Sequence, residues 1–333
     1  MRAAFRAAVA AWKDHAAVVI AGPNLTIDRT LAIDELRPGE VLRFERAEVT
    51  PGGKGVNVAR VARDLGAPAV LVGLLPGRTG VAGAALLGDE GIVVRGVEVG
   101  GELRSTAVVL ERSGRVTVLN EPGPALEPGE WELYEGVAAD ALRGERVLAC
   151  SGSLPPGAPD DAYGRLVALA HGAGAVAIVD VGGEQLAAAV AAGADVVTPN
   201  LAEAEGLLHG RADETVDAGD VGVVRERTVA AARALVERGA ARAVVTAAEA
   251  GAAVADGWMV QWVTAPAVAE VRNPIGAGDA LVGGLGLALE RGEEFAAAVA
   301  LGMACGAASV ETDVAGVVVP ERVAALLAAV SAV

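Results

Sequence analysis

The sequence contains few of the residues on which nucleic-acid-binding, metal-cluster and disulfide-rich proteins depend. Aromatic residues make up only 3% of its 333 positions, so few side chains could stack on nucleic-acid bases. Its two cysteines, Cys150 and Cys305, are too few and too far apart for a metal cluster or a disulfide framework. We therefore expect two buried thiols in a reducing compartment and a cytoplasmic protein.

Positive charge is also scarce, and no segment has the character of a membrane span. The 27 Lys and Arg residues against 43 Asp and Glu give a formal charge of -16, which repels nucleic acid and anionic membranes alike. The apolar run near the start is short and is interrupted by Lys13 and Asp14, and no later run is long enough to cross a bilayer. We expect an N-terminal extension over residues 1–15 and one domain over 16–333.

Short valine-rich segments alternate with segments rich in alanine and leucine. Residues 16–21, 147–150, 175–180, 195–200 and 243–246 are typical of buried strands, whereas 162–171, 185–192, 229–238, 279–308 and 321–333 are typical of helices. Alternation of this kind predicts an α/β fold with a mainly parallel sheet and helices on both of its faces. The acidic segment 211–221 is expected to be a surface loop.

The first third of the chain contains strands of a different kind. Residues 42–49 alternate between apolar and charged side chains, and residues 106–120 contain two such strands around Ser113 and Gly114. A period of two indicates a strand that is wet on one face, and the Ser-Gly pair favours a hairpin. We therefore predict a small β-sheet lid built from segments about 28–50 and 95–121.

Residues 273–279, NPIGAGD, precede a segment of helical composition. Gly276, Ala277 and Gly278 would expose main-chain N–H groups at the positive end of a helix, where charge on a transferred phosphoryl group is stabilised. Asp279 could be a simple helix cap, or its carboxylate could remove a proton from an attacking hydroxyl. The motif alone leaves both interpretations open.

Residues 51–60, PGGKGVNVAR, form a glycine-rich loop that leads into a helix. Gly52 and Gly53 would let the backbone approach a ligand and offer N–H groups to sugar hydroxyls, with Lys54 supplying charge. Asn57 lies one turn into the helix and could point back at the loop. The alternative is an ordinary strand-to-helix turn with a solvated lysine, and the spacing of a Walker A loop is missing.

Two further pairs of polar residues have both a structural and a functional interpretation. Asn200 and Glu203 follow a strand and could hold a hydrated magnesium ion, although a helix capping box explains the spacing more simply. Asp28 and Arg104 could be solvated surface charges. Alternatively, the carboxylate would accept hydrogen bonds from sugar hydroxyls and the guanidinium would bind a phosphate.

Together and in this order, these clusters resemble the ribokinase-like, PfkB-type carbohydrate kinases from about residue 16 onward. The two signature stretches are residues 52–66, GGKGVNVARVARDLG, and residues 273–279. Residues 120–124, NEPGP, and 151–157, SGSLPPG, are more similar to the phosphosugar branch, which contains 1-phosphofructokinases and tagatose-6-phosphate kinases.

The resemblance implies a ribokinase-like α/β domain with a β lid, a homodimer formed through the lid, and ATP and Mg²⁺ as cofactors; it also allows for K⁺. Asp279 would be the catalytic base, and the amides of residues 276–278 would form the anion hole. The remaining implied contacts are to the sugar (Asp28, Gly52, Gly53, Lys54, Asn57), to its phosphate (Arg104), and to ATP or magnesium (Asn200, Glu203, Thr246, Gly251).

Several positions depart from the family pattern, among them Pro76 in place of a glycine and the opening stretch 22–28, GPNLTID. Pro274 stands in place of a threonine, Thr198 in place of a lysine before Pro-Asn, and Ala248 in place of a glycine. The leading hypothesis is ATP-dependent phosphorylation of D-fructose 1-phosphate at its 6-hydroxyl. The alternatives are a tagatose-6-phosphate kinase, a kinase for an unphosphorylated sugar or nucleoside, and a catalytically weak sensor that binds sugar or nucleotide.

Overall fold

The computed structural model describes residues 17–44, 47–210 and 221–332. The N-terminal extension expected over residues 1–15 therefore lies outside the described residues, as does nearly all of the acidic loop expected over residues 211–221. Cys150 and Cys305 are both buried and free, as the sequence predicts. No helix among the described residues is long and apolar enough to cross a membrane.

The larger of the two sheets has ten strands in the order β14-β13-β12-β11-β10-β9-β8-β1-β4-β5. Pairing is parallel from β11 to β5 and antiparallel from β11 to β14. The strands are β1 (Val18–Ala21), β4 (Ala69–Leu74), β5 (Val93–Val97), β8 (Val147–Ser151), β9 (Val176–Asp180), β10 (Val196–Val197), β11 (Arg242–Thr246), β12 (Ala252–Asp256), β13 (Met259–Thr264) and β14 (Ser331–Ala332).

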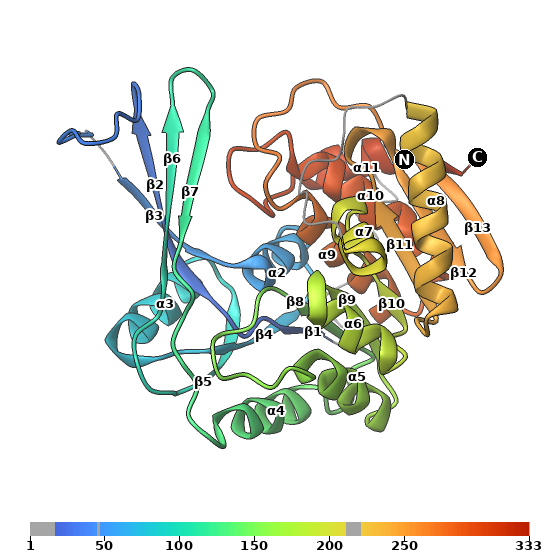
Figure 1. The fold of residues 1–333 in the computed structure, drawn as a ribbon, viewed down its shortest axis with the longest axis horizontal. Coiled ribbons are helices and arrows are strands. Elements are labelled where there is room, and N and C mark those ends of the chain that lie inside the picture. The colour runs from blue at the N-terminus through green and yellow to red at the C-terminus, as the bar shows by residue number, and fades with distance from the viewer. Residues whose placement is uncertain (1–16, 45–46, 211–220, 333) are drawn as a thin grey trace.

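Helices cover both faces of this sheet (Figure 1), as the alternation of valine-rich and alanine-rich segments predicts. Along β1, Val19 and Ala21 belong to the apolar core beneath α4, α5, α6 and α8, whereas Val18 and Ile20 belong to the core beneath α2, α9 and α10. The helices are α2 (Lys54–Asp64), α3 (Gly77–Asp89), α4 (Glu130–Ala141), α5 (Ala162–Gly172), α6 (Gly183–Ala191), α7 (Leu201–His209), α8 (Val221–Glu237), α9 (Ala277–Glu290), α10 (Phe295–Ser309) and α11 (Pro320–Leu327).

The smaller sheet, in the order β3-β2-β6-β7, projects away from the larger one on the left of Figure 1. Its strands are β2 (Thr26–Ile33), β3 (Ala47–Gly52), β6 (Ser105–Glu111) and β7 (Val116–Asn120). The predicted hairpin is present as β6 and β7. The prediction of a strand over 42–49 is wrong in its position, because pairing with β2 sets the register of β3 over residues 47–52. Residues 95–97 belong to β5 in the larger sheet.

The end of the chain also differs from the prediction. The sequence predicts a helix over residues 321–333, but α11 ends at Leu327 and Ser331–Ala332 forms β14. The main-chain groups along the edge of β13 supply hydrogen-bond partners that composition alone does not reveal. The helical segment expected over 279–308 is two helices, which separate after Glu290 where Gly292 has φ 75°.

Candidate functional site

Asp279 lies in the first turn of α9, directly after the glycine-rich turn of the 273–279 motif. Gly276 precedes the helix with φ 83°, and a Cβ there would lie 2.9 Å from Cβ of Ala315, so the turn requires glycine. The first N–H groups of a helix have no partners within the helix, and they lie at the positive end of its dipole. The carboxyl group of Asp279, which is only 5% exposed, is thus held beside these donors.

The surroundings of Asp279 raise its pKa to about 7. Burial is the main cause, and the carboxylates of Asp180 and Glu203 add to it, whereas Lys54 and a hydrogen bond from Asn57 oppose it. The Asn57 Nδ2 atom donates to Asp279 Oδ2 over 2.7 Å. A carboxyl group that titrates near neutrality and lies at an anion-binding helix terminus can act as a general base.

Asp180 joins this cluster, although it is not among the residues that the sequence predicts. It ends β9, and its Oδ2 atom lies 3.0 Å from Lys54 Nζ, which is 3.8 Å from Glu203 Oε1. Asp180 also accepts hydrogen bonds from the hydroxyls of Ser151 and Thr198. The pKa of Lys54 is raised, chiefly by Asp180. The sequence did contain a signal for Asp180: it is an acidic residue at the carboxyl end of a predicted parallel strand, and open α/β sheets bind ligands at that edge.

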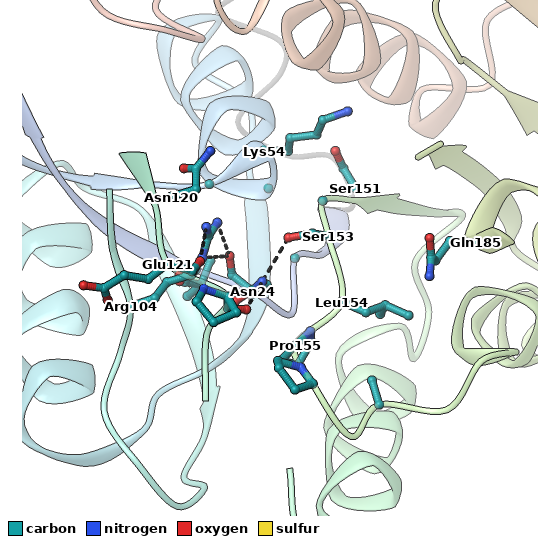
Figure 2. A pocket seen from close by; sticks show the side chains of 18 of the residues that line it. Asn24, Lys54, Arg104, Asn120, Glu121, Ser151, Ser153, Leu154, Pro155 and Gln185 are labelled. Carbon is teal, nitrogen blue, oxygen red and sulfur yellow. Dashed lines mark hydrogen bonds between the residues drawn. The ribbon is translucent and has the colours of Figure 1, made fainter. Parts of the chain in front are cut away.

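A polar cavity of about 760 Å³ opens between the smaller sheet and the residues after β8 (Figure 2). Of the predicted sugar ligands, Gly53, Lys54 and Arg104 line it. Several lining residues with hydrogen-bonding side chains were not predicted: Asn24, Asn120, Ser151, Ser153 and Gln185. We name this space the polar cavity.

Arg104 is half-buried at the wall of the polar cavity. Its Nε and Nη2 atoms donate to the main-chain oxygen of Asn24 over 3.3 and 3.0 Å, and its Nη1 atom donates to that of Glu121 over 3.2 Å (Figure 2). Burial lowers its pKa, while Asp28 and Glu121 oppose that effect. Arg104 therefore shapes the wall as well as bringing positive charge to the cavity.

Asp28, Gly52 and Asn57 lie next to the polar cavity rather than among the residues that line it. A Cβ on Gly52 would lie 2.0 Å from Asp28 Oδ2, so the glycine is what allows this carboxylate to lie against the loop. Burial raises the pKa of Asp28, which Arg60 and Arg104 oppose. Its Oδ1 atom is buried and has no hydrogen-bond partner among the described residues.

A second cavity, of about 520 Å³, is mostly apolar and lies against the start of α9. Two predicted nucleotide-binding residues, Thr246 and Gly251, line it together with Ala277 and Gly278 of the predicted anion hole. The rest of its wall is mainly aliphatic: Ala265, Val268, Val271, Leu281, Met303, Ala307 and Val310. We name this space the apolar cavity.

The departures from the family pattern lie around the same sites. Pro274 and Ala248 both line the apolar cavity. Among the described residues, Ala248 is the one non-glycine with positive φ, at 47°, which is a backbone conformation that favours glycine. Thr198 is buried and donates to Asp180 Oδ1 over 3.2 Å.

Asn200 and Glu203 form the helix cap that is the structural interpretation of their spacing. The Asn200 side chain accepts from the Glu203 N–H over 2.8 Å, and Glu203 Oε2 accepts from the Asn200 N–H over 2.9 Å. Within the described ranges, no group of three or more acidic, histidine or cysteine side chains is arranged to hold a metal ion. Magnesium commonly keeps several waters and binds substrate phosphates, so these few oxygens would suit a hydrated ion.

A model of the pfkB family carbohydrate kinases matches residues 17–322, which is nearly the whole chain. The chain belongs to this family. It is therefore a phosphotransferase with an alcohol group as acceptor, a reaction in which negative charge on the transferred group must be stabilised.

Individual pfkB-family proteins are similar over most of the chain. A 1-phosphofructokinase of Xanthomonas campestris is 34% identical over 80% of this chain and 82% of its own length. ATP-dependent 6-phosphofructokinase isozyme 2 of Escherichia coli is 32% identical over 85% of this chain and 89% of its own. A crystal structure of the Escherichia coli phosphofructokinase-2 with fructose-6-phosphate has a TM-score of 0.81 at 29% identity, covering 94% of this chain and 98% of that one.

Proposed function

We propose that this protein is an ATP-dependent sugar-phosphate kinase that converts D-fructose 1-phosphate to fructose 1,6-bisphosphate, with Asp279 as the catalytic base. The observation that carries the proposal is the position of Asp279 at an anion-stabilising helix terminus. Its pKa is raised to about 7, Lys54 of the polar cavity acts on it, and its neighbours Ala277 and Gly278 line the apolar cavity. In this reaction the carboxylate takes the proton of the 6-hydroxyl, whose oxygen then attacks the terminal phosphorus of ATP.

The polar cavity is the proposed sugar site. Gly53 would offer its main-chain N–H to hydroxyls, and Asp28 keeps a buried oxygen that can accept from one. Lys54 and Arg104 bring the positive charge that a phosphosugar needs in a protein of formal charge -16. The cavity would hold the sugar hydroxyl beside Asp279, and positioning of this kind lowers the barrier of the reaction.

The apolar cavity is the proposed nucleotide site, with Thr246 and Gly251 at its wall. The amides at the start of α9 would stabilise charge on the transferred phosphoryl group. Glu203 and Asn200 would hold a hydrated Mg²⁺, which would neutralise phosphate charge when bound; the surrounding carboxylates suit a divalent cation. K⁺ as a further cofactor stays a prediction.

Fructose 6-phosphate is a second candidate substrate, favoured by the similarity to the Escherichia coli 6-phosphofructokinase isozyme. Tagatose 6-phosphate and unphosphorylated sugars or nucleosides remain alternatives from the sequence. The sensor alternative is disfavoured by the buried Asn57–Asp279 contact, which holds the proposed base in place at the start of α9.

The testing experiment is an ADP-release assay with ATP and Mg²⁺ over a panel of sugars. The panel holds fructose 1-phosphate, fructose 6-phosphate, tagatose 6-phosphate, fructose, ribose and adenosine. The proposal expects the highest kcat/KM with fructose 1-phosphate. Preference for another phosphosugar would replace the substrate but keep the class, preference for ribose or adenosine would overturn the phosphosugar assignment, and no ADP release with any acceptor would favour the sensor.

We also propose that the smaller sheet forms a homodimer contact in the cytoplasm. Apolar side chains remain exposed on this sheet at Val49, Leu110, Val116, Val118 and Leu119. Leu110, Val116 and Val118 share one face of the hairpin of β6 and β7, because Leu110 pairs with Val116 and Val118 lies two residues further along its strand. A group of exposed apolar side chains on one face is typical of protein interfaces. Light scattering on the purified chain would distinguish a dimer from a monomer.

A further inference from the structure

Arg60 is a buried charged residue for which the proposed chemistry has no role so far. It lies on α2 one turn after Asn57 and is only 2% exposed. A charged side chain is rarely so deeply buried unless it is paired and hydrogen-bonded, because its desolvation is costly. Its partners therefore indicate what it holds in place.

The guanidinium of Arg60 joins Asn57, which contacts the predicted base, to three other segments of the chain. Its Nη1 atom donates to Asn57 Oδ1 over 3.0 Å and to the main-chain oxygen of Ala315 over 3.2 Å. Its Nη2 atom donates to the main-chain oxygen of Pro51 over 2.7 Å. Glu90 balances its charge by accepting from Nε and Nη2 over 2.8 and 2.7 Å. Both ends of the glycine-rich loop and the segment against Gly276 are thus tied to one side chain.

These contacts determine which way the Asn57 amide faces. A guanidinium can only donate hydrogen bonds, so it requires the amide oxygen, whereas an ionised carboxylate can only accept and so requires the amide NH₂. Arg60 therefore holds the oxygen, and Nδ2 is left pointing at Asp279 Oδ2, 2.7 Å away. In the reversed orientation the amide oxygen would face the carboxylate and repel it.

We propose that Arg60 is a positioning residue that orients the Asn57 amide as a donor to Asp279, an inference that rests on the proposed role of Asp279 as base. Arg60 acts through Asn57 and does not touch the reacting groups. Its contact with the Ala315 oxygen extends the same support to the turn that packs against Gly276.

The proposal predicts a particular change in the ionisation of Asp279. The charged groups that act on it are Lys54 on α2, Asp180 at the end of β9 and Glu203 on α7. Without the hydrogen bond from Asn57, Lys54 alone would oppose the rise in pKa that burial and the carboxylates of Asp180 and Glu203 cause. The pKa of Asp279 would then rise further, and less of the base form would be present at neutral pH.

Arg63 provides a matched control on the same helix. It also binds Glu90, with Nη1 3.0 Å from Oε2, and it contacts Asp64, but it has no hydrogen bond to Asn57. A substitution at Arg63 therefore perturbs the charge balance around Glu90 while leaving the Asn57 amide held by Arg60.

The experiment compares Arg60→Lys, Arg63→Lys, Asn57→Ala and the double variant Arg60→Lys/Asn57→Ala in the full chain. The readout is kcat/KM from pH 5.5 to 9, with the phosphosugar that the panel identifies. We expect Arg60→Lys to move the acid limb upward by about one pH unit, a loss of about fivefold at pH 7 that is regained near pH 9. Arg63→Lys should leave the limb in place. On the Asn57→Ala background, Arg60→Lys should not move it further.

The proposal is overturned if Arg60→Lys lowers activity equally at all pH values, if Arg63→Lys shifts the limb as much, or if the shift persists without Asn57. Should Arg60→Lys fail to fold, the double variant Arg60→Met/Glu90→Met removes the buried ion pair as a unit and carries the same expectation. The Asp279→Asn variant separates a failure of the Arg60 inference from a failure of the proposed function. An active Asp279→Asn variant would refute Asp279 as the base, whatever the Arg60 variants show.

Discussion

The polar cavity and the apolar cavity are built from different chemistry. The polar cavity is lined by amide, hydroxyl and charged groups such as Asn24, Ser153 and Arg104, whereas Val271, Leu281 and other aliphatic residues line much of the apolar one. A sugar phosphate carries many groups that must exchange water for protein hydrogen bonds, whereas a flat base can be held by burial. This difference supports the proposed sugar site in the polar cavity and the proposed nucleotide site in the apolar cavity.

The two sides also differ in charge. Lys54 and Arg104 both line the polar cavity, but Lys54 reaches Asp180 and Glu203 as well. The same lysine opposes the rise in the pKa of Asp279. One cation therefore serves both the proposed sugar site and the carboxylate cluster around Asp279.

The largest expected effect comes from removing the proposed catalytic base. Asp279→Asn should lower kcat by at least about 100-fold, because the general base is lost while the shape of the side chain is kept. The ADP-release assay measures this loss. Turnover close to that of the unmodified protein would show that Asp279 is not the base. The assignment of the sugar and the nucleotide to the two cavities would then lose its support.

The pH dependence of folding supplies the control for this variant. The pKa of Asp279 is raised from 3.8 to about 7 on folding, so its stabilising contribution is complete below pH 3.8 and is lost as the pH rises through about 7. The amide of the Asp279→Asn variant does not titrate and would carry no such dependence. We therefore expect the Tm of Asp279→Asn at pH 8 to equal or exceed that of the unmodified protein, and a large fall would mean that lost activity reflects lost structure.

An intermediate effect is expected on the polar side alone. Arg104→Ala should raise KM for the phosphosugar by about tenfold or more, because a charge-assisted contact is lost, and leave KM for ATP little changed. Arg115→Ala is the matched control, since Arg115 binds Glu111 on the smaller sheet away from the cavity. Equal losses with phosphosugar and free sugar would show that Arg104 holds the wall and not a phosphate.

The smallest effect is expected on the apolar side. Ala307→Phe would place a ring into the apolar cavity and should raise KM for ATP by about five- to tenfold, with little change in phosphosugar binding. Ala300→Phe on the same helix is the control, because Ala300 lines a different cavity. If Ala307→Phe weakened the phosphosugar instead, the assignment of the two cavities would have to be reversed.

The elements that the sequence predicts well are those whose pattern is local. The hairpin of β6 and β7 and the parallel strands β1, β8, β9 and β11 follow from periodicity and turn residues. The wrong predictions are those that a partner decides: β3 takes its register from β2, and β14 exists because β13 offers an edge. Most of β2 falls within the predicted lid segment 28–50, but its bounds as a separate strand are not predicted.

The same division holds within the site. The two glycine-rich motifs identified Lys54, Asn57 and Asp279, which the structure brings together. Asp180 and the polar wall of the first cavity were missed, since each is an ordinary residue at the end of a strand or in a loop until its neighbours are known. Likewise, the spacing of Asn200 and Glu203 is compatible with both a capping box and a magnesium site, and the sequence alone does not distinguish these two interpretations.

The sequence by itself determined the fold class, the family and the two loops where backbone approaches a ligand, because glycine placement and apolar period act over a few residues. The tertiary structure alone decided the ionisation of Asp279 and the chain of contacts from Arg60 through Asn57 to it. Burial and Coulomb interactions depend on distance in space, and Asn57 and Asp279 lie 222 positions apart in the chain.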